Sequence, residues 1–372
     1  MKRIAMFGHK RIPSREGGVE IVVDELSSRM VALGHQVVCY NRGGHHVSGQ
    51  EFDSAAMHEY KGVTLKSVPT IDKRGLAAVT SSFFAAILSA FSRADVVHIH
   101  AEGPAFMCWL PKLFGKRVVV TIHGLDWQRA KWKGGFGAKY IRAGERMAVR
   151  FADEIIVLSR AVQAYFKENY GRDTVFIPNG VSKPEFRQSD LITEQFDLKQ
   201  DEYILFLGRL VPEKGIHYLI EAFRGVDTDK ILVIAGGASD SDAYVQQLRE
   251  LARGDNRIIF TGFVQGQILE ELYSNAYLYV LPSDVEGMPL SLLEAMSYGN
   301  CCVTSDIEEC ATVVEDKGIT FPRGNVQALQ NALQRLCDHE EIVYAYRQTA
   351  ADYITQRYNW DDVTQKTLEL YQ

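Results

Sequence analysis

Short runs of apolar residues alternate along the chain with longer segments in which apolar residues recur every three or four positions. Uninterrupted runs are typical of buried parallel strands, and the longer period is typical of helices that cover them. The apolar positions of residues 19–34 fit the helical period and predict the first helix. Five runs in the first half predict strands over residues 4–8, 36–40, 96–100, 117–123 and 154–158.

The same alternation begins again after a break near residue 180. Pro178, Asn179 and Gly180 give a turn signal there, and the polar segment 182–201 follows. Strands that alternate with helices predict an α/β protein whose parallel sheets are covered on both faces. Five strands are predicted in the second half, over residues 203–208, 231–236, 257–261, 278–282 and 301–305.

The two patterns predict two doubly wound, Rossmann-like domains that face each other across a cleft, with the ligand at the carboxyl ends of the strands. We expect the first domain over residues 1–182 and the second over residues 183–352. A final helical stretch follows over about residues 353–372. The sequence leaves open whether this stretch packs back on the first domain.

The longest apolar stretch, residues 76–91, is interrupted by one threonine and three serines. It is too short and too polar to span a bilayer, so we expect a buried helix instead. The apolar start of the chain is too short for a secretory signal, because charged residues follow it at once. The six cysteines form no C-x-x-C pair, which predicts reduced thiols in a cytoplasmic protein.

The net charge of −6 conceals an asymmetry between the two halves. Residues 1–180 carry 25 Lys/Arg and 16 Asp/Glu, whereas residues 181–372 carry 16 Lys/Arg and 31 Asp/Glu. A basic first half predicts contact with an anionic surface or acceptor, although uneven charge can also serve solubility alone. Basic and aromatic residues alternate over residues 127–150, a mixture that suits an anionic membrane. The net negative charge of the whole chain and the lack of a nucleic-acid-binding motif argue against nucleic acid as a partner.

Two cations follow the strand predicted over residues 203–208. Arg209 and Lys214 lie between Gly208 and Gly215, where both can reach the carboxyl end of that strand. A guanidinium fork and an ammonium are suited to phosphate oxygens. A departing diphosphate needs either a metal ion or fixed cations of this kind. The spacing therefore favours a phosphate site over ordinary surface charges.

Two glutamates mark the segment S-D-V-E-G-M-P-L-S-L-L-E-A, residues 283–295. Glu294 falls in the first turns of a predicted helix that begins near Leu290, where it can accept hydrogen bonds from two ribose hydroxyls. The helix N-terminus adds amide donors for phosphate. Glu286 lies in a loop and is a candidate for sugar hydroxyls. The alternatives are an acid favoured by the helix terminus and a solvated loop residue.

The first half offers further candidates. Glu16 precedes Gly17 and Gly18 between the first strand and helix, where paired glycines allow a ligand close to the backbone. No G-x-G-x-x-G is present, which argues against a nicotinamide enzyme. His123 ends the strand over 117–123 with Asp126 nearby, a place from which it can touch a sugar.

Two further histidines, His98 and His100, share one face of the strand over 96–100. A metal pair is the alternative, but no third ligand at metal spacing accompanies them. We therefore expect core or hydrogen-bonded histidines there.

These motifs resemble the retaining glycosyltransferases of family 4, which have the GT-B fold. The resemblance covers most of the chain. It is carried by Gly17-Gly18, residues 121–127, 177–181, 208–215 and 261–263, and the E-x₇-E of 286–294.

The resemblance implies that Arg209 and Lys214 bind the diphosphate and that Glu294 binds the ribose. It places His123 near the transferred sugar and Phe263 beside the base. The remaining implied donor contacts are Glu286 with the backbone of Gly287, Met288, Pro289 and Leu290, and Gly17 and Gly18 under the phosphates. Met288 stands where many members have Phe, which alters the expected pocket shape.

By the same resemblance we expect front-face displacement with retention, a UDP-sugar as donor and no cofactor. The implied acceptor is a glycan or lipid-linked glycan in bacterial surface polysaccharide synthesis, at the inner face of the plasma membrane. Asp240-Ser241-Asp242 matches the D-x-D that holds a metal in another glycosyltransferase class, but it precedes a predicted helix, where such residues are ordinary caps. We therefore expect no metal.

Three rival functions remain at this point. A GT-B phosphorylase of the glycogen type needs a lysine that binds pyridoxal phosphate, and no such motif is apparent. A nucleotide-sugar epimerase needs a donor and no acceptor. A non-catalytic nucleotide-sugar binding subunit is the third rival, and the intact Arg209, Lys214, Glu286 and Glu294 argue against it.

Overall fold

The computed structural model describes residues 1–44, 57–71, 73, 75–128, 135–238 and 242–372. The chain forms two compact units. The first comprises Met1–Asn179 with Trp360–Gln372, and the second comprises Gly180–Asn359. The division thus falls slightly before the boundary that the sequence suggested, and the segment that joins the first unit begins later than residue 353.

The first unit is built on an eight-stranded sheet in the order β3-β4-β2-β1-β5-β6-β7-β8. Its pairings are parallel except that of β3 with β4. The five strands predicted for this half are confirmed, whereas β4 and the two-residue strands β3 and β8 were not predicted. The strands are β1 Arg3–Phe7, β2 Gln36–Arg42, β3 Glu59–Tyr60, β4 Val63–Val68, β5 Val96–His100, β6 Arg117–Ile122, β7 Glu154–Val157 and β8 Val175–Phe176.

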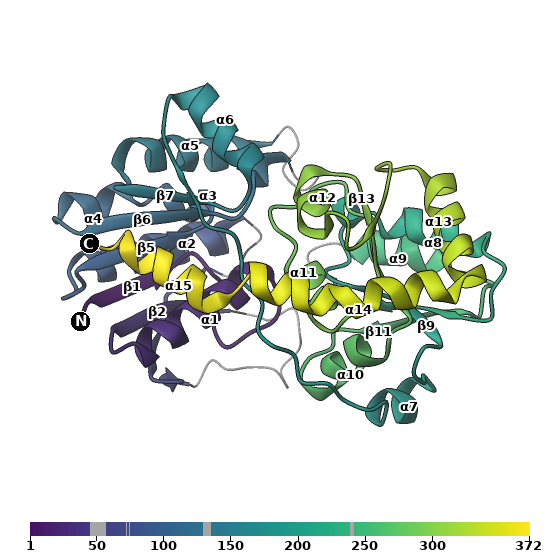
Figure 1. Ribbon diagram of the computed structural model, residues 1–372. Coiled ribbons are helices and arrows are strands. Elements are labelled where there is room, and N and C mark those ends of the chain that lie inside the picture. Colours follow the sequence, from purple (N-terminus) through teal and green to yellow (C-terminus); the bar gives the residue numbers. More distant parts are fainter. Residues whose placement is uncertain (45–56, 72, 74, 129–134, 239–241) are drawn as a thin grey trace. The chain divides into compact units, whose positions relative to one another are not determined.

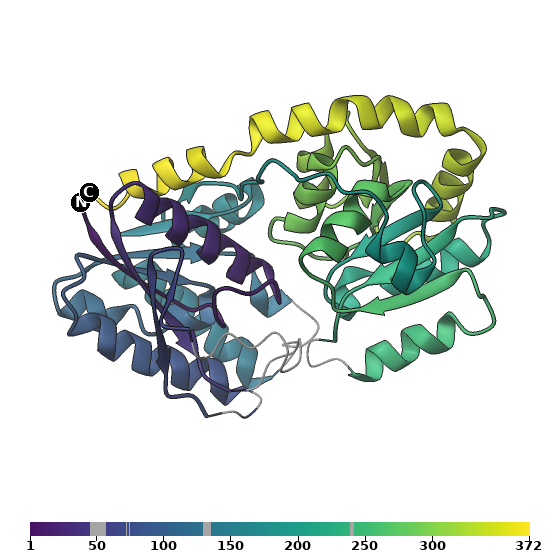
Figure 2. The same ribbon diagram turned by 90° about the horizontal axis from the view of Figure 1, so that it is seen from below.

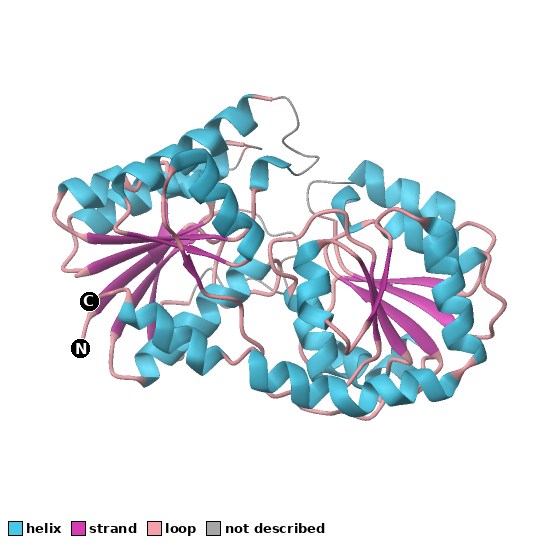
Figure 3. Ribbon diagram, turned by 45° about the horizontal axis from the view of Figure 1, so that its top comes forward, coloured by secondary structure: helices cyan, strands magenta, loops and turns pink. Residues whose placement is uncertain are grey.

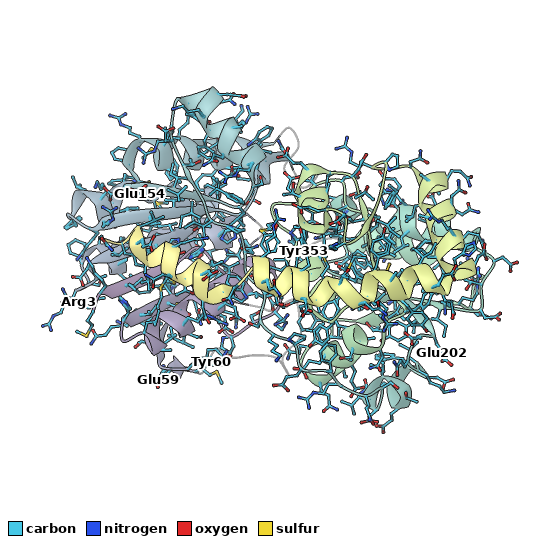
Figure 4. The ribbon with its side chains drawn as sticks, in the orientation of Figure 1. Arg3, Glu59, Tyr60, Glu154, Glu202 and Tyr353 are labelled. Atoms are coloured by element: carbon cyan, nitrogen blue, oxygen red, sulfur yellow. The ribbon has the colours of Figure 1, made fainter. Side chains whose placement is uncertain are left out.

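Helices cover both faces of this sheet (Figure 3). The predicted first helix is confirmed as α1, Gly18–Ala32. The other helices of the unit are α2 Leu76–Ala90, α3 Glu102–Ala105, α4 Trp109–Leu113, the 3₁₀ turn η2 Asp126–Gln128, α5 Phe136–Phe151, α6 Arg160–Tyr170 and α15 Trp360–Glu369. Charged side chains lie at the outer ends of the strands: Arg3, labelled in Figure 4, pairs with Asp95 at 2.5 Å.

The last helix, α15, packs against α1 although the two are at opposite ends of the chain (Figures 1 and 2). Arg29 of α1 donates to Asp361 at 2.9 Å. After the helix, the backbone carbonyl of Leu370 accepts from Arg117 at 2.6 Å, and the Tyr371 hydroxyl lies 2.6 Å from His98 Nδ1. The C-terminal segment is therefore part of the first unit's core.

The second unit has a six-stranded parallel sheet in the order β11-β10-β9-β12-β13-β14. The five predicted strands are confirmed, and β14 is additional. The strands are β9 Tyr203–Leu207, β10 Ile231–Ala235, β11 Ile258–Gly262, β12 Leu278–Leu281, β13 Cys302–Ser305 and β14 Ile319–Phe321. The helices are α7 Leu191–Phe196, the 3₁₀ turn η4 Pro212–Lys214, α8 Ile216–Arg224, α9 Asp242–Leu251, α10 Gln267–Asn275, α11 Leu290–Ser297, α12 Glu308–Val314, α13 Val326–Asp338 and α14 Glu340–Arg357.

Both units have the doubly wound, Rossmann-like architecture that the alternating pattern predicts. Every residue of β5 and of β12 is buried, as expected for strands covered on both faces. All six cysteines carry free thiols, and five of them are buried. Within the described parts of the chain, no helix has the length and apolar character needed to cross a membrane.

Helix α2 corrects the expectation of a buried helix. Its bulky apolar side chains are exposed: Phe83 and Leu88 are each 44% exposed, and Phe91 at the end of the helix is 69% exposed. Small side chains form the buried face instead. They are Ser81, Ser82, Ala85, Ala86, Ser89 and Ala90. The prediction was wrong because an apolar run does not reveal which of its members face the sheet.

Candidate active site

The second unit changes direction next to its central strand. The chain builds β9, β10 and β11 outward on one side and then crosses to β12, β13 and β14 on the other. The loops that follow β9 and β12 therefore leave neighbouring strands at the point where the strand order reverses. In open α/β sheets, ligands bind at the carboxyl ends of strands at such a point.

A glycine lets these two loops meet. Gly215 has a φ of +66°, and a Cβ added there would lie 2.0 Å from the carbonyl oxygen of Pro282. The Asp284 amide donates to the Glu213 carbonyl at 2.8 Å across the same contact. Any side chain at position 215 would force the loops apart, so the loop geometry requires glycine here.

An ion pair joins the two loops of the site. Lys214 Nζ lies 2.6 Å from Glu286 Oε1, and their side chains are only 13% and 8% exposed. The Ser283 hydroxyl donates to the same carboxylate oxygen at 2.6 Å. An ammonium carries three donors, so this contact does not exhaust the capacity of Lys214. The pair holds a cation and an anion at the strand ends.

The backbone is tightly packed beside this pair. A Cβ at Gly236 would lie 1.8 Å from the Gly208 carbonyl oxygen, and the Gly208 amide donates to Ala235 at 3.0 Å. A Cβ at Gly208 would lie 4.0 Å from Lys214 Cε, so Gly208 adjoins the lysine stem. Arg209 follows directly and is half-buried.

The segment after Glu286 leads into the N-terminus of α11. Gly287, Met288 and Pro289 precede Leu290, the first helical residue, and no side chain caps the helix. First-turn amides of an uncapped helix are donors for an anion such as phosphate. The sequence-predicted helix start near Leu290 is thus confirmed.

Glu294 lies one turn further along α11. The Tyr273 hydroxyl of α10 donates to Glu294 Oε2 at 3.2 Å, and the Tyr273 ring stacks on Tyr298 with centroids 5.3 Å apart. Tyr279 of β12 donates to the Ser291 hydroxyl at 2.9 Å. Tyr273 thus holds the half-buried glutamate in place. Phe263 follows β11 directly and is also half-buried.

The first unit has its own change of direction, between β1 and β5. A Cβ at Gly8 would lie 2.1 Å from the His100 carbonyl oxygen, so the loop after β1 passes directly over the end of β5. His123 follows β6 and is buried, and its Nε2 lies 3.1 Å from His100 Nδ1. His98 contacts Tyr371 and Thr121, with its Nε2 2.7 Å from Thr121 Oγ1.

The expectation of hydrogen-bonded core histidines is therefore confirmed for His98 and His100. Both are completely buried. Burial lowers the pKa of His98 to about 3 and the pKa of His100 well below its ordinary value, and neighbouring histidines add to both effects. Both rings are neutral at physiological pH.

The loop after β1 also contains the paired glycines. Gly17 precedes α1 and Gly18 begins it. The Lys10 amide donates to buried Glu20 Oε1 at 2.8 Å, and Lys10 Nζ lies 3.5 Å from Glu16 Oε2. Burial raises the pKa of Glu20. The charge and the amide of Lys10 lower this pKa by more than burial raises it, so the net pKa lies below the usual value.

Asp126 begins the short η2 turn, and its amide donates to Glu102 Oε2 at 2.8 Å. Glu102 is completely buried. Burial, together with the nearby charges of Asp126 and Glu145, raises the pKa of Glu102 well above its usual value. Glu102 therefore gives up its proton less readily than an exposed glutamate.

The structure sorts the predicted residues into two sets. The second unit carries, in the loops after β9 and β12 and at the start of α11, Gly208, Arg209, Lys214, Glu286, Gly287, Met288, Pro289, Leu290 and Glu294. Phe263 follows β11, two strands from β9, and the first unit carries Glu16, Gly17, Gly18, His123 and Asp126. Sequence reasoning missed Ser283, Tyr273 and the contact of His100 with His123. Only Ser283 carried a signal, because it begins the quoted acidic motif.

Across the described residues, no group of three or more His, Cys, Asp or Glu side chains is arranged to hold a metal ion. Asp240 and Ser241 of the D-x-D match lie outside the described residues. Asp242 is the first residue of α9.

Comparison with known families assigns each unit. Residues 16–183 match the family described as Glycosyltransferase Family 4, and residues 188–356 match Glycosyl transferases group 1. The chain belongs to the GT-B glycosyltransferases. The predicted family and fold class are thereby confirmed.

Individual relatives of this glycosyltransferase agree. An uncharacterized glycosyltransferase of Methanocaldococcus jannaschii is 24% identical over 99% of this chain and 97% of its own length. The O-antigen chain mannosyltransferase B of Escherichia coli is 28% identical over 48% of each chain. Among solved structures, Anabaena HepE in complex with UDP and glucose has a TM-score of 0.83 at 18% identity, covering 99% of this chain and 98% of its own.

The structure of WaaG, a glycosyltransferase involved in lipopolysaccharide biosynthesis, has a TM-score of 0.76 at 17% identity. It covers 99% of this glycosyltransferase and 99% of its own chain. At such identity the structural likeness establishes the shared fold.

Proposed function

We propose that this glycosyltransferase moves a sugar from a nucleotide-diphosphate sugar to a hydroxyl of a glycan or lipid-linked acceptor, with retention and without a metal ion. The observation that carries the proposal is the meeting of the Lys214 and Glu286 loops at the reversal of strand order, beside the N-terminus of α11. Cations, amide donors and carboxylates there match a ligand that has both phosphates and hydroxyls.

Each residue of the second unit has a role in this proposal. Arg209 and Lys214 bind the diphosphate and stabilise the charge that develops on it as the sugar leaves. The first-turn amides of α11 bind phosphate oxygens, and Glu294 accepts from the ribose hydroxyls. Glu286 keeps the Lys214 ammonium at the strand ends and accepts from a sugar hydroxyl. Phe263 flanks the base.

The transfer step balances without a further reactant. The acceptor oxygen attacks the anomeric carbon from the side on which the diphosphate leaves. The bond from that carbon to the phosphate oxygen breaks while the bond to the acceptor forms, and a phosphate oxygen takes the acceptor proton. The roles that the family resemblance implies for His123, Gly17 and Gly18 towards the donor, and for Glu16 and Asp126 towards the acceptor, stay predictions for the first unit.

The comparisons support the choice of substrates without deciding it. The HepE structures contain UDP or UDP-glucose, which favours a UDP-sugar as donor. WaaG and the mannosyltransferase are named for lipopolysaccharide and O-antigen synthesis, which favours a lipid-linked glycan acceptor at the inner face of the plasma membrane. The transferase families argue against an epimerase or a binding subunit.

The test begins with thermal unfolding in the presence of UDP-, GDP- and dTDP-sugars, because a ligand that binds the native state raises its stability. The stabilising donor is then incubated with and without acceptor glycans and with a chelator. We expect release of the nucleoside diphosphate that survives chelation and a product that keeps the donor's anomeric configuration. A new nucleotide-sugar isomer formed from donor alone would establish an epimerase instead.

A further inference from the structure

Two neighbouring helices of the first unit, α2 and α4, expose several large apolar side chains. Helix α4 packs against α2, and the rings of Phe91 and Phe114 have centroids 4.5 Å apart. Leu113 is 74% exposed beside them. We call this surface the apolar patch; it consists of Phe83, Phe84, Leu88, Phe91, Leu113 and Phe114. Contiguous apolar surface of this kind marks an interaction site.

The face of α2 that packs on the sheet is made of small side chains and does not use these large apolar residues. On the sheet side of α2, the Ser81 hydroxyl donates to Ala77 at 2.7 Å and the Ser82 hydroxyl donates to Ala78 at 2.6 Å. A surface helix normally turns its bulky apolar face inward and its polar face outward. Here serine and alanine face inward and phenylalanine faces outward, so the exposed face is suited to an apolar environment outside the unit.

A basic stripe lies on the helix next to the patch. Helix α5 packs against α4, and its exposed side chains Lys139, Arg142, Arg146 and Arg150 recur every three or four residues on one face. Within helices α2, α4 and α5 as described, the one acidic residue is Glu145, and it is completely buried. These helices therefore present apolar and positive groups and no exposed negative charge.

The basic stripe borders a cavity of about 360 Å³ between α5 and α6. Its lining includes Arg142, Arg146, Trp127 and Tyr165. The Arg142 guanidinium lies over the Trp127 ring, 4.3 Å from its centroid. Arginine together with tryptophan and tyrosine is suited to the headgroup level of a bilayer, where phosphate and apolar groups meet.

We infer that this face of the first unit binds an anionic membrane surface. The apolar patch enters the boundary between headgroups and acyl chains, while the basic stripe meets lipid phosphates. Because none of the described helices can cross a bilayer, the contact is interfacial. A second copy of the chain fits less well, since self-association through this face would bring two basic stripes together. The inference rests on the proposed function in one respect: a lipid-linked acceptor explains why the protein would bind a membrane.

Vesicle sedimentation with the full chain tests the inference at low salt. The probes are phosphatidylcholine vesicles with or without about one third phosphatidylglycerol. We expect sedimentation with the anionic vesicles. Replacing both Phe91→Ser and Leu113→Ser should weaken it at least tenfold, the effect of withdrawing two large apolar side chains from the bilayer. Leu33→Ser is the matched control, because Leu33 is 58% exposed at the end of α1.

The basic stripe is tested separately with Arg146→Gln and Arg150→Gln together. This variant should lose several-fold in affinity for anionic vesicles, and its loss should shrink as salt is added. Lys66→Gln, an exposed charge on β4, is the control. A Phe91→Trp variant keeps an aromatic side chain and reports insertion through the additional quenching by brominated lipid relative to the wild-type protein, whose four tryptophans give the background.

Three outcomes would overturn the inference. They are equal sedimentation with neutral vesicles, unchanged binding by the Phe91→Ser and Leu113→Ser variant, and a concentration-dependent dimer that this variant abolishes. Donor hydrolysis in solution separates this inference from the proposed function. A protein that binds vesicles but hydrolyses no donor contradicts only the function, and one that hydrolyses donor but ignores vesicles contradicts only the membrane contact.

Discussion

At the scale of single residues, the site depends on partners that lie far apart in the sequence. Lys214 and Glu286 are 72 positions apart and yet form an almost buried ion pair. Removing one member of such a pair leaves the other charge without its partner, which costs more than an exposed pair would. Ser283 moderates this cost, because its hydroxyl still binds Glu286.

Lys214→Met should reduce turnover by about 10²–10³, the loss typical of one preorganised donor that stabilises transition-state charge. The methionine keeps the length of the side chain, so packing changes little. Steady-state kinetics with the stabilising donor measure the effect, and Lys199→Met, an exposed lysine of the same unit, should behave as wild type. Near wild-type turnover in Lys214→Met would remove this lysine from the mechanism.

Tyr273→Phe should act on donor binding through Glu294. Loss of one hydroxyl that positions the carboxylate is worth about 1 kcal/mol, or roughly a fivefold rise in the donor KM with little change in kcat. Glu294→Gln should raise the same KM more strongly. Initial rates at varied donor concentration separate the two parameters. A fall in kcat at constant KM would mean that Glu294 acts in the chemical step and not in donor binding.

At the scale of elements, the long apolar strands and α1 were predictable, because their periodicity extends over several residues. The short β3 and β8 were not, since two residues hold no period. Helix α2 was predicted as a buried helix, but its bulky apolar side chains are exposed. The contact of α15 with α1 and the Lys214–Glu286 pair were invisible for another reason: each joins segments whose proximity only the folded chain creates.

Gly215→Ala should separate the two loops of the donor site. A Cβ at this position meets the Pro282 carbonyl, so the cost includes a backbone shift in addition to the strain of φ +66°. Gly171→Ala is the matched control, because Gly171 has the same left-handed conformation, with a φ of +63°, and nothing within 4 Å of its added Cβ.

The control should therefore lose only about 1 kcal/mol of stability and keep its donor affinity. Gly215→Ala should lose at least about tenfold in affinity, on the scale of 1.4 kcal/mol. Isothermal titration with the donor or its nucleoside diphosphate measures both variants. Equal affinities in the two would show that the loop contact does not shape the site.

At the scale of the whole molecule, the two units differ in their buried titratable groups. His9, His98 and His100 all lie buried in the first unit, and burial lowers each pKa, to about 4 for His9 and about 3 for His98. Unfolding exposes these rings and returns them to the ordinary value near 6.5. Their contribution to stability is therefore complete above pH 6.5 and is lost as the pH falls below it.

Acid should consequently destabilise the first unit between pH 6.5 and pH 5. The slope from each buried histidine approaches about 1.4 kcal/mol per pH unit as the unfolded ring becomes protonated, and Glu102, whose pKa is raised, acts in the opposite sense and reduces the sum. All four tryptophans belong to the first unit, so their fluorescence during urea unfolding reports on that unit alone.

His98→Leu removes one of the titrating groups and should lower this slope by up to about 1.4 kcal/mol per pH unit. His339→Leu, at an exposed position of the second unit, should leave the slope unchanged. The Leu side chain also leaves the Tyr371 and Thr121 hydroxyls without their histidine, so the variant starts from a lower stability at pH 7.5. The comparison is therefore made on slopes. A tryptophan-detected midpoint that stays constant from pH 7.5 to pH 5 would mean that these histidines are protonated in the folded unit as readily as in the unfolded chain.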